Sequence, residues 1–471
     1  MLGGVALAAL LALGAAQVGK AQSGGAGFDT SRPPQLVATA DGVTINPILS
    51  AGDIVGNYQM SGVPDGLGAY TMTRSNGSEA LQVLMNHELG GTAPPGVGAR
   101  VSKVTLDPES RGVRRASYLI DGKQGFSRFC SSTLARIAGE PMYFTGEEST
   151  DTGSLTGDPG DGIGRGGTSI ALNAETGDYR QTRHFGLLPH ENVVPVKGLA
   201  SATFLTTEDG DPTGNASQLY AYMAPTFRGA ISGNEGSLYV WKANDDVATD
   251  GNPSTNDISV GETIQGHFVR VNQDRNTSAE KLEANAQSRD AFDFVRLEDA
   301  AVSKREGNRL YINDTGSAGA ETQRGRLYKF QFDKADPRNA SLTVVLDNDT
   351  STDPVKLTNP DNLDTSRNSI VIQEDRNSEY RAENYGRVIV YDFSTKELRA
   401  VARVATPDGT PPGTWESSGV INASGTLGED RWLLDVQAHS ATAPQPGRSL
   451  EPNSSTGEDG QLLEIKIPGS S

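Results

Sequence analysis

Short apolar runs that end in acidic residues recur along the chain. Four such runs occupy residues 141–148, 202–209, 309–314 and 369–375. Each has the length of a strand, is rich in β-branched and aromatic residues, and is bounded by turn-forming residues. The pattern predicts β-strands that finish at a carboxylate or a pair of carboxylates.

A second kind of strand follows many of the first after a turn, and carries Leu-Tyr or an aliphatic pair. Its examples are residues 218–222, 237–241, 326–330, 387–391 and 461–465. The succession is typical of consecutive antiparallel strands in a propeller blade. The best helix candidate is 278–289, with a thin apolar stripe. We therefore predict an all-β fold, a β-propeller with long inter-strand insertions and few short helices. A pair of large β-sandwiches is the alternative.

The N-terminus has the pattern of an export signal. Residues 1–19 are apolar, and the small residues Ala15, Ala16 and Ala21 suit signal-peptide cleavage. We expect a signal peptide over 1–22, a flexible segment over 23–39 and a single propeller domain over 40–471. Since no other stretch is apolar enough to span a bilayer, we expect a periplasmic or secreted protein without a membrane span.

Charge and cysteine content exclude several classes. With 41 Lys and Arg against 59 Asp and Glu, the net charge is −18. Nucleic-acid binding needs cations to displace counterions from phosphates, so we expect no nucleic-acid partner. Cys130 is the single cysteine, which excludes an intrachain disulfide. A packed thiol is one interpretation of Cys130, and a metal ligand is the other.

Acidic residues at strand ends indicate a cation site. In a propeller the innermost strands point into a shared channel, so carboxylates that end them converge and need protons or a bridging cation. Ca²⁺ suits many oxygen ligands in irregular geometry. The candidate ligands are Glu147, Glu148, Glu208, Asp209, Glu298, Asp299, Asp361, Asn362, Glu374 and Asp375. For any one pair alone, a solvated turn is the alternative.

Eight segments, in order along the chain, resemble the PhoX-type alkaline phosphatases. They are residues 84–88, 128–134, 145–148, 294–299, 359–363, 373–375, 415–419 and 434–439. The resemblance implies an exported, monomeric β-propeller that hydrolyses phosphomonoesters with calcium and iron in its channel. It also implies ligands at Glu147, Glu148, Glu208, Glu298 and Glu374, with Cys130 as a candidate iron ligand. The chain departs from the family at Gly146, where the family has a cysteine.

The leading hypothesis is a metal-dependent phosphomonoesterase acting on a small phosphate ester. Arg296 is the candidate phosphate-binding residue because a guanidinium matches phosphate oxygens, and Glu298 lies two residues on, on the same strand face. We assign both to catalysis, with Arg296 as a carboxylate partner the alternative. The rival hypotheses are a calcium-dependent lactonase or esterase, and a non-enzymatic calcium-binding propeller.

Overall fold

A computed structural model describes residues 27–90, 98–150, 166–210, 216–244, 254–273, 277–320, 322–376, 380, 385–442 and 458–471. The expected signal peptide, 1–22, lies outside the described residues. Strands dominate, and no described helix is long and apolar enough to cross a membrane.

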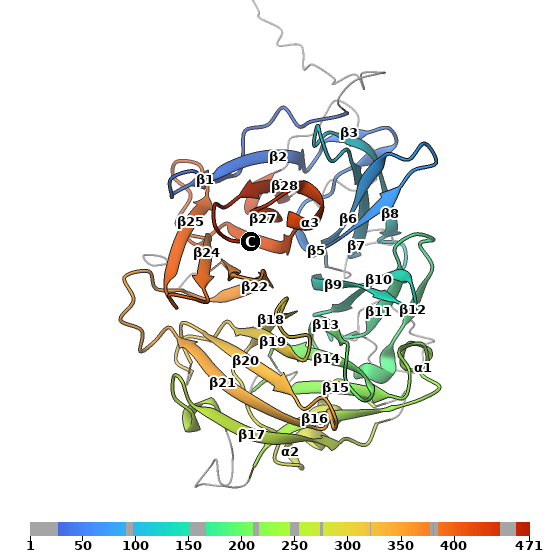
Figure 1. Ribbon diagram of the computed structural model, residues 1–471, viewed down its shortest axis with the longest axis vertical. Coiled ribbons are helices and arrows are strands. Elements are labelled where there is room, and N and C mark those ends of the chain that lie inside the picture. Colours follow the sequence, from blue (N-terminus) through green and yellow to red (C-terminus); the bar gives the residue numbers. More distant parts are fainter. Residues whose placement is uncertain are drawn as a thin grey trace, which may run out of the picture.

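The strands form blades that follow one another around a centre (Figure 1). Blade 1 consists of β5 (Pro64–Thr73), β6 (Glu79–His87), β7 (Arg100–Leu106) and β8 (Val113–Asp121). Blade 2 consists of β9 (Phe129–Ile137), β10 (Glu140–Glu147), β11 (Ser169–Asn173) and β12 (Tyr179–Gln181). Blade 3 consists of β13 (His190–Val196), β14 (Ala202–Glu208), β15 (Leu219–Ala224) and β16 (Ser237–Ala243).

The second half of the chain supplies three more blades. Blade 4 consists of β18 (Leu297–Val302), β19 (Arg309–Asp314), β20 (Arg326–Phe332) and β21 (Asn339–Asp347). Blade 5 consists of β22 (Pro360–Thr365), β23 (Ser369–Glu374), β24 (Arg387–Asp392) and β25 (Leu398–Val404), with β1 (Leu36–Ala38) at its edge. Blade 6 consists of β26 (Glu416–Asn422), β27 (Arg431–Thr442), β28 (Glu458–Lys466) and β2 (Thr44–Ser50).

A few elements lie outside this scheme. β17 (Thr263–Arg270) pairs with both β16 and β21 and joins blades 3 and 4 into one sheet, and β3 (Ile54–Val55) and β4 (Tyr58–Gln59) form a hairpin. The helices are α1 (Phe227–Ser232), α2 (Ala279–Gln287) and α3 (Ser424–Leu427), with 3-10 turns η1 (Arg183–Phe185) and η2 (Thr255–Asp257). α2 confirms the predicted helix, and the Ser278 side chain caps its N-terminus by accepting from Lys281 N–H.

The innermost strands close into a ring. β5, β9, β13, β18, β22 and β26 each contact the next, and β26 contacts β5. Six apolar clusters fill the spaces between neighbouring blades; one packs Tyr70 and Phe129 between blades 1 and 2, another packs Val401 and Trp432 between blades 5 and 6. The predicted propeller is therefore confirmed, and the sandwich alternative is excluded.

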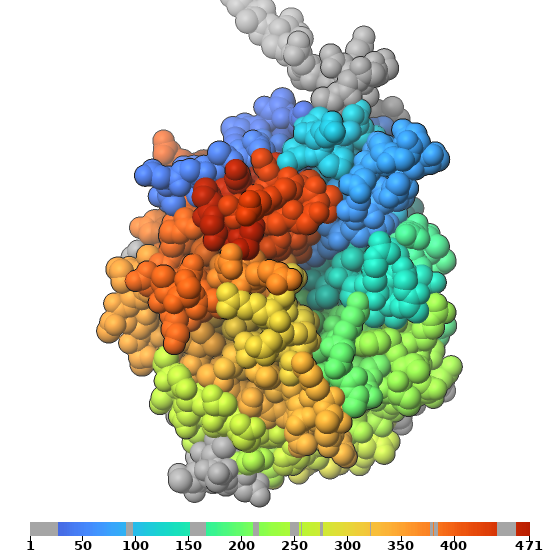
Figure 2. All heavy atoms as spheres, in the orientation of Figure 1, coloured from blue at the N-terminus to red at the C-terminus, as the bar shows by residue number. Residues whose placement is uncertain are grey.

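The N-terminal segment closes the ring by completing blade 6. β2 pairs with β28, so strands from the two ends of the chain share one sheet, and Figure 2 shows the blue and red parts side by side. An ion pair between Arg32 and Asp459 adds to this closure. β1, which lies within the expected flexible segment 23–39, pairs with β25.

The acid-ended strands exist as predicted, but they are not the innermost strands of their blades. β10, β14, β19 and β23 are second strands of their blades, each paired with an innermost strand. Their last residues therefore lie one strand away from the channel. This displacement decides which carboxylates face it.

Candidate metal centre

The second residue of the innermost strand repeats as an acid or a thiol from blade to blade. Blades 1 to 5 place Asp65, Cys130, Glu191, Glu298 and Asp361 at this position. All five are buried, with exposed fractions of 0–7%. A left-handed residue precedes three of these strands: Val63, Arg128 and Asn359 have φ of 50–53°. This repeated backbone kink is the kind of local strain that persists at functional sites.

The last residue of each second strand has a different task. Glu147 accepts hydrogen bonds from the N–H groups of Ser127 (2.8 Å) and Thr168 (3.2 Å), which lie just before β9 and β11. Glu374 likewise accepts from Thr358 N–H (2.9 Å) and Arg387 N–H (3.1 Å). These carboxylates tie together the loops that lead into two strands.

Glu208 and Asp314 repeat that arrangement in blades 3 and 4. Glu208 accepts from Gln218 N–H at 2.9 Å, and Asp314 accepts from Arg296 N–H at 3.0 Å. The expected ligands Glu147, Glu208 and Glu374 are thus placed in backbone-bonding positions, because they end second strands rather than innermost ones.

The residue after the second strand returns to the channel side. Glu88, Glu148, Asp209 and Asp375 occupy this position. Each donates its backbone N–H to the carbonyl of the residue directly before the innermost strand of its blade. Of the Glu-Glu pair, it is therefore Glu148 that reaches the centre.

Three groups of ligand atoms form a continuous cluster. Asp65, Glu88 and Cys130 form the first group, and within each group the ligand atoms lie within 4.8 Å of one another. The second group is Cys130, Glu148 and Glu191, and the third is Glu191, Glu298 and Asp361. Because Cys130 belongs to two groups and Glu191 to two, the three groups are neighbours.

Several oxygens of the cluster are buried without a hydrogen-bond partner. They are Glu191 Oε2, Glu298 Oε1 and Asp361 Oδ1, which belong to the same group. Leaving such acceptors unpaired is costly. Glu298 Oε1 has an ion-pair partner in Arg296 NH2 at 3.2 Å, whereas Glu191 Oε2 and Asp361 Oδ1 have no polar partner among the described residues. These two oxygens and the nearby thiol fit divalent or trivalent cations. The oxygens suit Ca²⁺, while Cys130 adds a soft ligand of the type that iron accepts.

The pKa values of the clustered acids also indicate a cation site. Burial, and then repulsion from Glu88, raises the pKa of Asp65 to about 7. Burial likewise raises the pKa of Glu191 and of Asp361 well above the usual range, with smaller contributions from neighbouring acids. In a cation-free state these groups therefore hold protons near neutral pH, and a bound cation would replace those protons.

Two arginines border the cluster. Arg296 contacts Asp209 through Nε–Oδ1 (2.7 Å) and NH2–Oδ2 (2.9 Å), and its NH2 lies 3.2 Å from Glu298 Oε1. Arg128 pairs with Glu88 at 3.2 Å and also with Glu148. The Arg128 side chain is 44% exposed and that of Arg296 is 36% exposed. Both guanidiniums can therefore meet an anion that approaches from solvent.

Two further candidate ligands have other roles. Asp299 accepts from the Leu363 N–H at 3.0 Å and from the Asn192 side chain. The amide of Asn362 donates to Asp65 and Ser131, while its oxygen accepts from Gly419 N–H at 2.9 Å. These hydrogen bonds occupy the atoms that a cation would need.

The structure gives a steric reason for Gly146. A Cβ added there would lie 2.3 Å from His190 Cβ. This backbone has no room for a cysteine side chain at position 146. The thiol of the cluster comes instead from Cys130 on β9, whose Sγ donates to Asp65 Oδ2 at 3.2 Å.

Sequence reasoning missed Asp65, Glu88, Arg128 and Glu191. A signal for the innermost strands was present: an acid or cysteine followed by a small or polar residue, once in each of blades 1 to 5. The pairs are Asp65-Gly66, Cys130-Ser131, Glu191-Asn192, Glu298-Asp299 and Asp361-Asn362.

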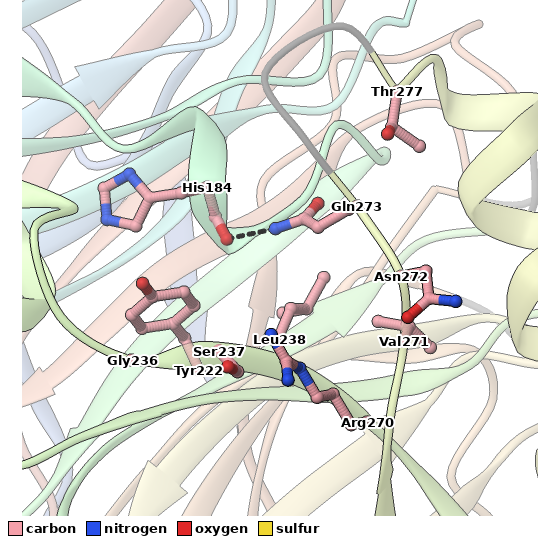
Figure 3. A pocket seen from close by; sticks show the side chains of 10 residues that line it. All are labelled: His184, Tyr222, Gly236, Ser237, Leu238, Arg270, Val271, Asn272, Gln273 and Thr277. Carbon is pink, nitrogen blue, oxygen red and sulfur yellow. Dashed lines mark hydrogen bonds between the residues drawn. The ribbon is translucent and has the colours of Figure 1, made fainter.

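A separate cavity of about 420 Å³ lies at blade 3 and the segment before α2 (Figure 3). Its polar groups largely bond to the protein: the Gln273 amide donates to the His184 carbonyl, and the Tyr222 hydroxyl donates to the Glu235 carbonyl. It lacks a converging set of acids, so the channel remains the better candidate site.

No protein-family model and no curated protein matches the chain in sequence. In structure, it is similar to an α-L-arabinanase from Penicillium chrysogenum complexed with arabinobiose (11% identity, 91% of this chain and 99% of that chain, TM-score 0.43). It is also similar to a periplasmic gluconolactonase from Pseudomonas aeruginosa (12% identity, 85% and 86%, TM-score 0.37) and to the NanB sialidase from Streptococcus pneumoniae (8% identity, 90% and 71%, TM-score 0.43). At these identities and TM-scores, none of the similarities assigns an activity to this chain.

Proposed function

We propose that the chain is an exported, metal-dependent phosphomonoesterase whose active site is the acidic end of the channel. The observation that carries the proposal is the linked cluster of carboxylates and one thiol, with orphaned oxygens and two bordering arginines. Carboxylates alone repel a phosphate. A site with carboxylates beside partly exposed guanidiniums would therefore bind cations, and the bound cations and the guanidiniums together would then bind an anionic substrate.

The residues divide into three roles. Asp65, Cys130, Glu191, Glu298 and Asp361 are proposed to hold the cations. Arg296 and Arg128 are proposed to bind and orient the phosphate oxygens, and Asp209 fixes the plane of the Arg296 guanidinium. Bound cations supply charge neutralisation and an activated water to such a reaction.

The direct test is hydrolysis of p-nitrophenyl phosphate by the mature protein at pH 8–9, with calcium and iron supplied and then with excess chelator. We expect turnover that the chelator abolishes. Glu298→Gln should lose activity together with bound metal. The matched control is Glu306→Gln, which removes a surface carboxylate that pairs with Arg309. Lactone hydrolysis without phosphatase activity, or calcium-dependent stability without turnover, would overturn the proposal.

The thiol permits a separate test of metal identity. If Cys130 binds ferric iron, protein prepared with iron absorbs visible light through thiolate-to-iron charge transfer, and Cys130→Ser abolishes the band. Calcium binding, measured by calorimetry, should be retained in that variant, because the carboxylate group Glu191, Glu298 and Asp361 does not include the thiol. An unchanged spectrum in Cys130→Ser would exclude Cys130 as the iron ligand.

A further inference from the structure

The channel has a second compartment at its other end. All innermost strands start at the acidic cluster, and their later residues line a cavity of about 850 Å³. β5 contributes Leu67–Thr71, β9 contributes 132–136, and β13 contributes Asn192, Val194 and Pro195; Lys197, directly after β13, also lines the cavity. The volume lies in the range of small-molecule sites.

A layer of hydrogen-bonded side chains separates the two compartments. On the acidic side, Asn362 donates to Asp65 (3.2 Å) and to Ser131 Oγ (2.8 Å). On the cavity side, Asn192 donates to Asp299, which also accepts from Leu363 N–H. A ligand in the cavity therefore meets Asn192 and Asp299 and not the acidic cluster.

One side of the cavity is cationic. Arg136, Lys197 and Lys304 follow one another on blades 2, 3 and 4. Lys304 is paired with Asp364 at 3.1 Å. Across the part of the chain that the structure describes, no carboxylate forms an ion pair with Arg136 or Lys197.

These two cations are also neighbours. Partial burial, and then the charge of Arg136, lowers the pKa of Lys197. Side chains with like charge placed together at a cavity, in a protein of net charge −18, create a local attraction for an anion that the rest of the surface lacks.

The wall on blades 1, 5 and 6 is largely apolar. It includes Leu67, Ala69, Leu363, Val420 and Ile421. An anion that filled the cavity with its charge at Lys197 would place the rest of its body against this wall. Burial of apolar surface and ion pairing would then both favour binding.

We propose that this compartment binds an organic anion, with its carboxylate, sulfonate or phosphate group at Arg136 and Lys197 and an apolar body against blades 1, 5 and 6. The site is independent of the metal centre and of the reaction proposed there.

Binding of 1-naphthalenesulfonate to chelator-treated protein tests the proposal. The chelator removes metal ions from the acidic cluster, and the Arg296→Gln control below reports binding of the probe at the arginines that border that cluster. Calorimetry should give saturable binding. The double variant Arg136→Gln/Lys197→Gln should bind at least tenfold more weakly, and Lys197→Glu more weakly than Lys197→Gln. Both sites are exposed, so these variants should keep the wild-type melting temperature.

Two controls make the result specific. Lys281→Gln removes an exposed lysine on α2 and should leave the affinity unchanged, as should Arg296→Gln at the metal centre. The neutral analogue 1-naphthylmethanol and inorganic sulfate should each bind more weakly than the sulfonate. Absence of binding, equal affinity in the double variant, or loss of binding in Arg296→Gln would overturn the proposal.

Discussion

Arg296 and Asp209 form a bidentate ion pair across two blades, with Nε–Oδ1 at 2.7 Å and NH2–Oδ2 at 2.9 Å. Asp209 follows β14 in blade 3, whereas Arg296 precedes β18 in blade 4. The pair leaves the guanidinium in contact with Glu298 and 36% exposed. An arginine fixed in this way is already oriented before a substrate arrives, which lowers the entropy cost of binding.

The first prediction concerns this pair. Arg296→Lys keeps the charge but removes the planar fork, so we expect kcat/KM for p-nitrophenyl phosphate to fall about tenfold or more, mainly through KM. Asp209→Asn should raise KM by a smaller factor, since the guanidinium remains but loses its orientation. Arg338→Lys, at an exposed pair with Asp336, is the control. Equal kinetics in Arg296→Lys and the wild type would contradict a phosphate-binding role.

The second prediction separates ligands from backbone-bonding acids. Glu191→Gln should lower the metal content, measured by elemental analysis, because Glu191 belongs to two ligand groups. In chelated protein the same change should leave the melting temperature equal or higher, since a neutral amide replaces a buried acid whose charged form is disfavoured by burial and by neighbouring acids.

Glu147→Gln should show the opposite pattern. Glu147 accepts from two backbone N–H groups, and a glutamine offers one acceptor and one clashing donor, so the free energy of unfolding should fall by about 1–3 kcal/mol. Its metal content should match the wild type. Metal loss in Glu147→Gln without loss of stability would restore it as a ligand.

The position of each strand within its blade explains which strands and candidate ligands could be predicted from the sequence and which could not. Second strands such as β10 and β14 are packed on both faces, so they form uninterrupted apolar runs that are easy to recognise. Innermost strands begin with residues that face the channel, such as Asp65-Gly66 and Ser417-Ser418, and their apolar signal is broken. The fold was therefore predictable from the runs, while three of the candidate ligands, Glu147, Glu208 and Glu374, end second strands rather than innermost ones.

Some predicted residues do lie in the candidate metal centre. Cys130, Glu148, Glu298 and Asp361 were predicted and belong to the ligand groups. Asp65 and Glu191 lie far apart in sequence and meet only because the ring of blades closes. No local sequence pattern indicates that the ring closes, because closure depends on β2 completing blade 6.

The third prediction is a pH dependence of the metal-free protein. Burial raises the pKa of Asp65 and of Asp299 to about 7, whereas an unfolded aspartate titrates near 4. The folded state therefore binds more protons than the unfolded state, and the free energy of unfolding falls as pH rises towards and through 7. His87 and His190, whose pKa values burial lowers to about 3 and about 4, act oppositely below pH 6.5.

Melting temperatures are therefore compared above pH 6.5, outside the range in which these histidines act oppositely. In excess chelator we expect the melting temperature to drop by several °C between pH 6.5 and pH 8. Calcium should recover it at pH 8 more than at pH 6.5, because ions and protons compete for the same carboxylates. A chelated protein that becomes more stable as the pH rises over this interval would contradict the placement of these acids.

The last prediction concerns closure of the ring by the N-terminal segment. Removing residues 1–26 leaves every described strand in place, so the melting temperature should equal that of the full chain. Removing residues 1–39 deletes β1 and the Arg32–Asp459 ion pair, and we expect the melting temperature to decrease by several °C.

Removing residues 1–51 also deletes β2, which leaves β28 as an open edge and uncovers the apolar cluster between blades 6 and 1. That fragment should aggregate or unfold without cooperativity, as followed by circular dichroism and size-exclusion chromatography. A cooperative transition of the 52–471 fragment at the full-length melting temperature would show that the ring holds without its closing strand.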